Sequence, residues 1–247
     1  MNKHRMPMSA PMIRAIQREI DQPGTGKTMT RRLVKPQPWR DEFGKTCVGE
    51  IFGPEMYAPI AVDRFGEQVP GPEVFGVYSE DGDWAAKSPY GKPGDLLAFT
   101  ETFALVQPTK DGILEYEEAR LATLYDQQVE IWYRADGSLG LLSTLWDDGP
   151  RWTGSMLMPY PASRYTGLIT DVRVERLCSI TKEDALAEGV IPQEYTTARG
   201  MFGSLWQSIH GPGSWEENPW VWVYTFRPIA ANVLDVEREP EKYGVST

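Results

Sequence analysis

The stretch "DQPGTGKTMTRR" (21–32) gathers a lysine, three threonine hydroxyls and two arginines near the start of the chain. Gly26-Lys27-Thr28 has the form of the end of a phosphate-binding P-loop, but Asp21 stands where that loop needs its first glycine. A P-loop also leads from a strand into a helix, whereas the apolar spacing in residues 11–20 predicts a short helix before the loop. We therefore expect the lysine to have a task other than binding a nucleoside triphosphate.

The residues that usually bind zinc are scarce in this sequence. The 247 residues include only two histidines, His4 and His210, and two cysteines, Cys47 and Cys178. Their spacing matches no zinc site, which argues against a hydrolase with His or Cys metal ligands. We expect no metal and no cofactor, although a site of carboxylates and carbonyls stays open. Without a visible secretory signal, the cysteines are expected as reduced thiols in a cytoplasmic protein.

The charge distribution sets limits on the binding partners. The net charge of −10 argues against a protein that grips long nucleic-acid backbones, because such affinity comes from neutralised phosphates. Residues 1 to 60 nevertheless carry ten Lys/Arg against six Asp/Glu. A basic face around "KTMTRRLVK" (27–35) suits a small anionic or nucleobase-like ligand, or a weak, salt-dependent contact with single-stranded RNA. No apolar run is long enough to span a bilayer, and nothing indicates an obligate protein partner.

The elements that must position these residues can be predicted from β-branched, aromatic and capping residues. Strands are expected at 28–34, 95–106, 129–135, 165–177 and 220–229. Helices are expected near 11–20, at 182–188 after the N-cap Thr181, and at 201–211. Residues 36–94 are rich in Pro and Gly and predict long connections, and 231–247 predict a polar, partly ordered tail. Strands without a βαβ rhythm favour an α+β fold, a mixed β-barrel with short helices at its side.

Six blocks, in order, resemble the ASCH domain of the PUA-like superfamily, in particular its longer phage-type members. They are "MPMSAPMIRAI" (6–16), "GKTMTRRLVKPQP" (26–38), "SPYGKPGDLLAFTETFA" (88–104), "MLMPYPASRYTGLITDVRVERLCSITKEDALAEGV" (156–190), "FGSLWQSIHG" (202–211) and "NPWVWVYTFRPI" (218–229). The resemblance implies a single PUA-like barrel domain over residues 1–230, with a variable insertion near 107–150 and a cleft for a nucleobase or a piece of RNA.

A small bacterial branch of this family consists of N4-acetylcytidine amidohydrolases, which use a lysine and a threonine in K-x-x-T and a later glutamate. The resemblance places these catalytic residues at Lys27, Thr30 and Glu188, and Arg32 fits the form "KTxTxR". It further implies a substrate-binding role for Arg32, Glu101, Ser9 and Phe103. The expected function is metal-independent removal of the acyl group from N4-acylated cytosine nucleosides or bases.

This trio makes chemical sense. A threonine hydroxyl becomes a nucleophile once a base removes its proton, and a lysine can do so when burial and neighbouring cations lower its pKa. Glu188 would orient Lys27 or protonate the leaving cytosine nitrogen. In a straight strand, residues 27 and 30 point to opposite faces, whereas 28, 30 and 32 share one. Lys27 must then lie in the turn after Gly26, and Thr28 is the rival nucleophile.

Other interpretations of these residues remain open. Lys27, Arg31 and Arg32 can form a solvated basic edge, and Glu188 can be an ordinary exposed helical carboxylate. Glu101 is flanked by large apolar residues and either faces outward or reads the edge of a base. The alternative function is a non-catalytic PUA-like module that binds RNA or a modified nucleobase, such as an accessory phage protein. Phage-type relatives carry an arginine and a tryptophan where this chain has Thr100 and Phe103, which points to a different substrate.

Overall fold

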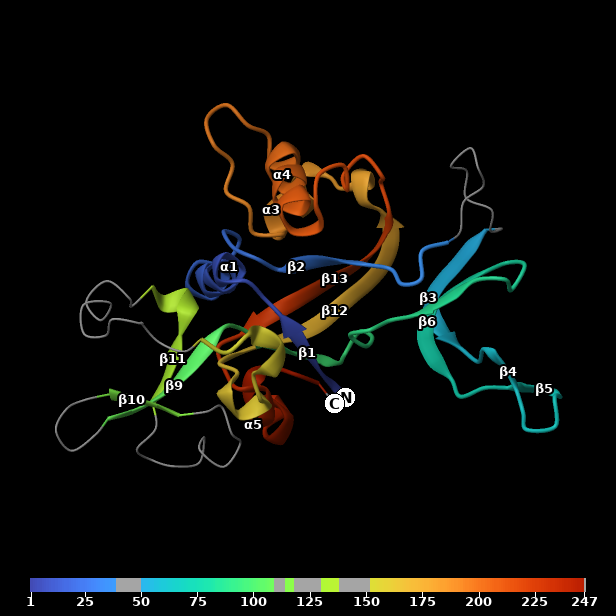
Figure 1. Ribbon diagram of the computed structural model, residues 1–247, viewed down its shortest axis with the longest axis horizontal. Helices are drawn as coiled ribbons and strands as arrows, with labels where there is room; N and C mark the ends of the chain where they lie inside the picture. Colours follow the sequence, from blue (N-terminus) through green and yellow to red (C-terminus); the bar gives the residue numbers. More distant parts are fainter. Residues whose placement is uncertain (39–49, 109–113, 118–129, 138–151, 247) are drawn as a thin grey trace. The chain divides into compact units, whose positions relative to one another are not determined.

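A computed structural model describes residues 1–38, 50–108, 114–117, 130–137 and 152–246 (Figure 1). The chain divides into two compact units, each built from separate segments, so no single cut of the sequence divides them. The first unit consists of Met1–Lys27, Asp95–Leu168 and Arg227–Thr247, and the second of Thr28–Gly94 and Ile169–Phe226. The single domain over 1–230 expected from the sequence stays a prediction.

A sheet with the order β1-β8-β12 is the centre of the first unit. β1 (Lys3–Pro7) runs parallel to β8 (Leu96–Thr100), and the start of β12 (Tyr165–Arg176) runs antiparallel to it. The helix α1 (Ala10–Asp21) follows β1 and buries the side chains of Ile13, Ala15 and Ile16. A core cluster of this unit consists of Leu96, Ala98, Ile229, Val233, Val236 and Val245.

The last residues of the chain correct the expectation of a polar tail. Residues 231–247 include the helix α5 (Val233–Arg238) and the 3-10 helix η6 (Pro240–Tyr243). The Asn232 side chain caps α5 by accepting a hydrogen bond from the Leu234 N–H. Val233 and Val236 lie three residues apart, on one helix face, and both are fully buried. In the sequence these two valines stand among charged residues, so the apolar face of the helix was not recognised.

A smaller antiparallel sheet, also in the first unit, has the order β10-β9-β11. Its strands are β9 (Phe103–Pro108), β10 (Leu114–Glu117) and β11 (Glu130–Tyr133). The 3-10 helices η2 (Arg134–Asp136), η3 (Ser155–Leu157) and η4 (Tyr160–Ala162) complete this part of the unit. Most of the insertion expected near 107–150 lies outside the described residues.

The second unit contains a sheet with the order β12-β13-β2. β2 (Met29–Leu33) runs antiparallel to β13 (Trp220–Ile229). The helices α3 (Lys182–Ala187) and α4 (Ala198–His210) lie next to each other (Figure 1). The 3-10 helix η5 (Leu177–Ser179) lies between β12 and α3. One core cluster joins sheet and helices and includes Met29, Val221, Val223, Ala185, Phe202 and Trp206.

The second unit also contains short strands where the sequence predicts only long connections. β3 (Ile51–Tyr57), β6 (Val74–Ser79) and β7 (Ala85–Lys87) form an antiparallel sheet in the order β3-β6-β7. β4 (Ile60–Val62) and β5 (Gln68–Pro70) form a two-stranded hairpin. The frequent glycines obscure these strands, but Gly76 has a structural reason: a Cβ there would overlap the carbonyl oxygen of Ala86 on the neighbouring strand.

The predicted mixed α+β class is confirmed, and the sheets of the described residues do not close into a barrel. The predicted strand 95–106 is two strands, because the chain leaves β8 at Glu101 and enters a different sheet as β9. The predicted Thr181 cap of α3 is confirmed, since its side chain accepts a hydrogen bond from the Asp184 N–H. No helix in the described part of the chain is long and apolar enough to cross a membrane.

Candidate functional site

The alternation of side chains along β2 divides the candidate residues between the two faces of the sheet. Thr30 is paired with Tyr224 and Arg32 with Trp222 in the register of β2 and β13. Partners in such a register point to the same face, so these four side chains share one face of the sheet. Arg31, between Thr30 and Arg32, points to the other face.

Thr30 is buried, with 2% of its surface exposed. The rival nucleophile Thr28 is partly buried just before the strand. Both backbone groups of Thr28 are hydrogen-bonded. The N–H donates to the Ala187 carbonyl at 2.9 Å, and the carbonyl accepts from the Phe226 N–H at 2.8 Å.

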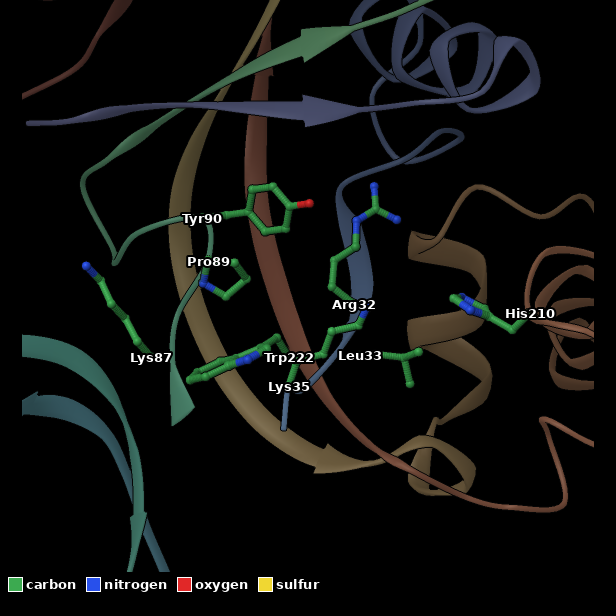
Figure 2. Close-up of a pocket in the computed structure, with 8 residues that line it drawn as sticks. All are labelled: Arg32, Leu33, Lys35, Lys87, Pro89, Tyr90, His210 and Trp222. Carbon is green, nitrogen blue, oxygen red and sulfur yellow. The ribbon is translucent and has the colours of Figure 1, made fainter. Parts of the chain in front are cut away.

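A pocket of about 270 Å³ lies beside β2 in the second unit. Figure 2 shows Arg32 on β2 and Lys35 just beyond its end, with Tyr90, Pro89, Lys87 and Trp222 to one side and Leu33 and His210 to the other. These eight residues line the pocket, and they come from β2 and the residues just after it, from β13, from the 87–90 segment and from the end of α4.

The aromatic wall of the pocket is held in place by contacts within the second unit. The rings of Tyr90 and Tyr224 meet edge to face with centroids 5.6 Å apart, and the Tyr224 and Ser88 hydroxyls are hydrogen-bonded at 2.9 Å. Burial raises the pKa of Tyr224, although the hydrogen bond with Ser88 acts in the opposite direction. The Tyr224 hydroxyl therefore stays neutral and anchors the segment that presents Tyr90.

The pocket carries positive charge. Arg32, Lys35 and Lys87 line it, and in the described part of the chain no carboxylate does. The electrostatic effect is visible at His210: burial lowers the pKa of its imidazole, and the charges of Arg32 and Lys35 lower it further. The ring of His210 also packs on Trp206, with centroids 4.1 Å apart. This arrangement favours an anionic ligand with a planar, apolar part.

Arg31 is the centre of a buried ion cluster on the opposite face of β2. Its guanidinium contacts Glu175 and Asp184 at 2.6 Å each and Glu188 at 3.3 Å. Arg173 contributes a second cation and contacts the same Asp184 at 2.6 Å. Arg31 and Glu188 are thus buried and paired, which excludes the interpretation of Arg31 as a solvated basic edge and of Glu188 as an exposed helical carboxylate.

Lys27 belongs to the first unit and is almost fully buried, with 1% of its surface exposed. Its N–H donates to the carbonyl of Ala15 in α1 at 3.0 Å, and the N–H of Gly26 donates to the Glu19 carboxylate at 2.8 Å. The chain thus leaves α1 and enters β2, which is the reverse of a P-loop and confirms that this motif is absent.

Glu101 also lies in the first unit, where it is fully buried and paired. Arg164 contacts its carboxylate with Nε at 2.8 Å and with the second guanidinium nitrogen at 3.1 Å. The same arginine reaches Asp136 at 2.7 Å and lies 4.0 Å from the centre of the Tyr133 ring. Burial raises the pKa of Glu101, while Arg164 acts against this rise. Glu101 therefore belongs to a closed ion-pair network within its unit.

The two remaining predicted binding residues occupy ordinary structural positions in the first unit. Ser9 is exposed at the N-terminus of α1 and makes no side-chain cap hydrogen bond. Phe103 is fully buried in a core cluster with Leu105, Met158 and Ala162. The Phe103 ring contributes to packing, so its position gives no support to the predicted contact with a substrate.

The structure therefore brings Thr30 and Arg32 to one sheet face and joins Glu188 to Arg31 on the other. It adds Tyr90, Lys87, His210 and Trp222, which the sequence analysis did not select. Their signals are visible afterwards in "SPYGK", where an aromatic and a basic residue stand among small ones, and in "WVWVY", where aromatic residues alternate with valines.

In the described residues, no group of three or more His, Cys, Asp or Glu side chains is placed to hold a metal ion. In comparisons with models of protein families, with curated proteins and with solved structures, nothing matches this chain.

Proposed function

We propose that this protein is a cytoplasmic, metal-independent amidohydrolase that removes the acyl group from N4-acylated cytosine nucleosides or bases. The observation that carries the proposal is the Thr30 hydroxyl. The Thr30 side chain is buried, and it shares a sheet face with the pocket residues Arg32 and Trp222. The sequence resemblance to the ASCH domain supports the same assignment. On the same ground we propose that the fold is PUA-like.

The reaction follows from these residues by ordinary acyl-transfer chemistry. Lys27, three places before Thr30 in the chain, removes the hydroxyl proton, and the Thr30 oxygen bonds to the amide carbonyl carbon. The bond from this carbon to the cytosine N4 then breaks, and N4 takes up a proton to become an amine. Water hydrolyses the threonyl ester, which releases the carboxylic acid and restores the hydroxyl. Glu188, which pairs with Arg31 on the opposite face of β2, acts through the lysine and not on the substrate.

Arg32 and the aromatic residues would bind the cytosine part of the substrate. Tyr90 and Trp222 line the pocket with flat apolar surface, on which a pyrimidine can stack. Arg32 lies two residues beyond Thr30 on the same face, so a group bound beside Arg32 is close to the reacting hydroxyl along the strand.

The test is the conversion of N4-acetylcytidine by purified, chelator-treated protein, followed by the loss of the acylcytosine absorbance. Thr30→Val keeps the shape of the side chain and removes the nucleophile, so turnover should fall by roughly a thousandfold or more. Lys27→Ala should have a similar effect, and the double variant should lose little more, because residues that act as one unit are not additive. Circular dichroism must show that each variant is folded.

Thr28→Val is the matched control, because Thr28 is the neighbouring threonine, just before β2, and receives the same substitution. Turnover should survive in this variant. Wild-type turnover in Thr30→Val would overturn the proposal. Loss in Thr28→Val with turnover kept in Thr30→Val would move the nucleophile to Thr28.

A second candidate function is non-catalytic binding of RNA or of a modified nucleobase. The pocket of three cations and two aromatic rings favours it, since such a pocket binds a nucleobase without any reacting group. Binding of cytosine ligands by wild-type protein, with no turnover of any acylated cytosine, would select this alternative.

A further inference from the structure

The hairpin formed by β4 and β5 in the second unit exposes three large apolar side chains. Ile60, Val62 and Phe65 have 73%, 68% and 74% of their surface exposed. Ile60 and Val62 lie two residues apart in β4, so they point to the same face of the hairpin, and Phe65 follows in its turn. We call these three side chains the hairpin patch. Single exposed apolar residues are common on protein surfaces, whereas a group of them on one short element indicates an interaction site.

The packing of the hairpin does not account for the patch. Apart from Ala61, every residue of β4 and β5 is exposed. The hairpin continues the paired strands β3 and β6, since β4 follows β3 and β5 precedes β6 in the chain (Figure 1). Ile60 and Val62 have the β-branched shape that favours a strand, but Phe65 lies in a turn, where strand propensity does not call for it. The apolar character of the patch is therefore better explained by a contact outside the chain.

The turn that carries Phe65 is ordered by hydrogen bonds. The carboxylate of Asp63 accepts from the N–H of Phe65 at 2.8 Å and from the N–H of Glu67 at 3.0 Å. The Asp63 N–H donates to the Glu67 carbonyl at 2.9 Å, and the guanidinium of Arg64 lies 4.7 Å from the centre of the Phe65 ring. A turn held in this way presents the ring to a partner without the entropy cost of ordering a loop on binding.

The charge of the surrounding sequence limits what can cover the patch. Residues 39–83 carry ten Asp/Glu and three Lys/Arg, a net charge of −7, compared with −10 for the whole chain. The two lysines of residues 84–94 reduce this value only to −5. A second copy of the protein would bring the same negative charge to the patch, and nucleic acids and anionic lipid surfaces would be repelled for the same reason. The charge of a complementary partner is positive.

We infer that the hairpin patch binds a protein partner that offers an apolar surface bordered by lysine and arginine side chains. The Phe65 ring and the two β-branched side chains supply the apolar contact, and the acidic residues around them favour a basic partner. The patch residues do not line the pocket beside β2. The inference is therefore independent of the proposed deacylation.

The probe is a synthetic amphipathic helical peptide of leucine and lysine, with the leucines on one face, titrated calorimetrically into the protein. Two matched peptides carry glutamate in place of lysine, or serine in place of leucine. The leucine–lysine peptide should bind at least roughly tenfold more tightly than either matched peptide, and more weakly as salt rises. Equal binding of the serine–lysine peptide would show that charge alone is recognised and would overturn the inference, as would the absence of binding by the leucine–lysine peptide.

Substitutions in the patch show whether the peptide binds there. The double variant Ile60→Ser, Phe65→Ser should weaken binding of the leucine–lysine peptide by at least roughly tenfold. The matched control is Ile191→Ser, Tyr195→Ser, which removes two other strongly exposed apolar side chains of the same unit. All four side chains are exposed, so both variants should unfold at the same urea concentration as the wild type. An equal loss of binding in the control would contradict the inference.

Methyl NMR gives an independent location. The signals of Ile60 and Ile191 can be assigned by their loss in Ile60→Val and Ile191→Val. The Ile60 signal should shift when the leucine–lysine peptide is added, and the Ile191 signal should stay in place. A shift at Ile191 without a shift at Ile60 would place the peptide elsewhere and refute the role of the hairpin.

Analytical ultracentrifugation separates a basic partner from a second copy of this chain. The wild type and the Ile60→Ser, Phe65→Ser variant should have the same sedimentation coefficient over a range of protein concentrations, because the acidic charge opposes contact between two hairpins. A wild-type dimer that is lost in the variant would assign the patch to self-association and overturn the inference.

Discussion

At the scale of the single residue, Arg31 decides how substitutions of Glu188 must be interpreted. Arg31 is buried among Glu175, Asp184 and Glu188, and Arg173 is the second cation of this cluster. Removing the Glu188 charge therefore alters a structural ion cluster as well as any catalytic group. A loss of activity in Glu188→Gln indicates a catalytic role only if the variant has the same free energy of unfolding as the wild type.

The first prediction concerns Arg31 itself. Arg31→Met keeps most of the buried volume but removes an arginine that contacts all three carboxylates. Removing one partner of a buried ion pair costs about 3–5 kcal/mol, so the free energy of unfolding should fall by about this amount in a urea titration. Arg238→Met is the control, since Arg238 is exposed and pairs at the surface with Asp235. A fall below about 1 kcal/mol would contradict this account.

At the scale of the element, the contact between α1 and the turn after it fixes the position of the Lys27 backbone, just before β2. The N–H groups of Gly24 and Gly26 both donate to the carboxylate of Glu19, and the Lys27 N–H reaches Ala15. A side chain at Gly26 has no room, because a Cβ there would overlap the Ala15 carbonyl oxygen and the Glu19 N–H nitrogen. The glycine that looks like part of a P-loop is therefore required by helix packing.

The second prediction follows from this close approach. Gly26→Ala should lower the free energy of unfolding by about 1–3 kcal/mol, because the helix and the turn must separate to admit the methyl group. Any turnover should fall too, since Lys27 moves with the turn. The control is Gly154→Ala in the same unit, where an added methyl group would meet no atom within 4 Å and φ is −64°. Equal stability of the two variants would refute the packing argument.

Local signals predicted most of the elements, and the failures have physical causes. The strands β2, β12 and β13 are rich in β-branched and aromatic residues, and the Thr181 cap marks α3. The start of α4 was missed: this helix begins at Ala198 behind a Thr197 cap, three residues before the predicted start. Gly200, between this cap and the predicted start, hides the first turn, because glycine disfavours a helix interior.

The candidate site was less predictable than the elements. Thr30, Arg32 and Lys27 lie within six residues of one another, so a short motif can select them. Tyr90, His210 and Trp222 come from distant parts of the chain and reach the pocket only through strand pairing and the end of α4. The cluster around Arg31 depends on the same long-range pairing. No local pattern in the sequence carries this information.

At the scale of the whole molecule, the dependence of stability on pH includes a contribution from the buried carboxyl of Glu101. Burial raises the pKa of Glu101 above its ordinary value of 4.5, although Arg164 opposes this rise. The folded protein therefore holds this proton more tightly than the unfolded chain does. The stabilising contribution is complete at pH values below 4.5 and is lost as the pH rises through the raised pKa of the folded state.

The third prediction compares wild type with Glu101→Gln, which keeps the shape of the side chain and stays neutral at every pH. The stability of the Gln variant relative to wild type should increase between about pH 4 and about pH 7, because only wild type must bury a charge at the higher pH. Urea titrations at each pH measure this difference, and contributions common to both proteins cancel. The same substitution at Glu241, an exposed residue of η6, controls for the loss of one carboxylate. A relative stability that instead decreases toward neutral pH would show that the ion pair with Arg164 outweighs the burial of Glu101.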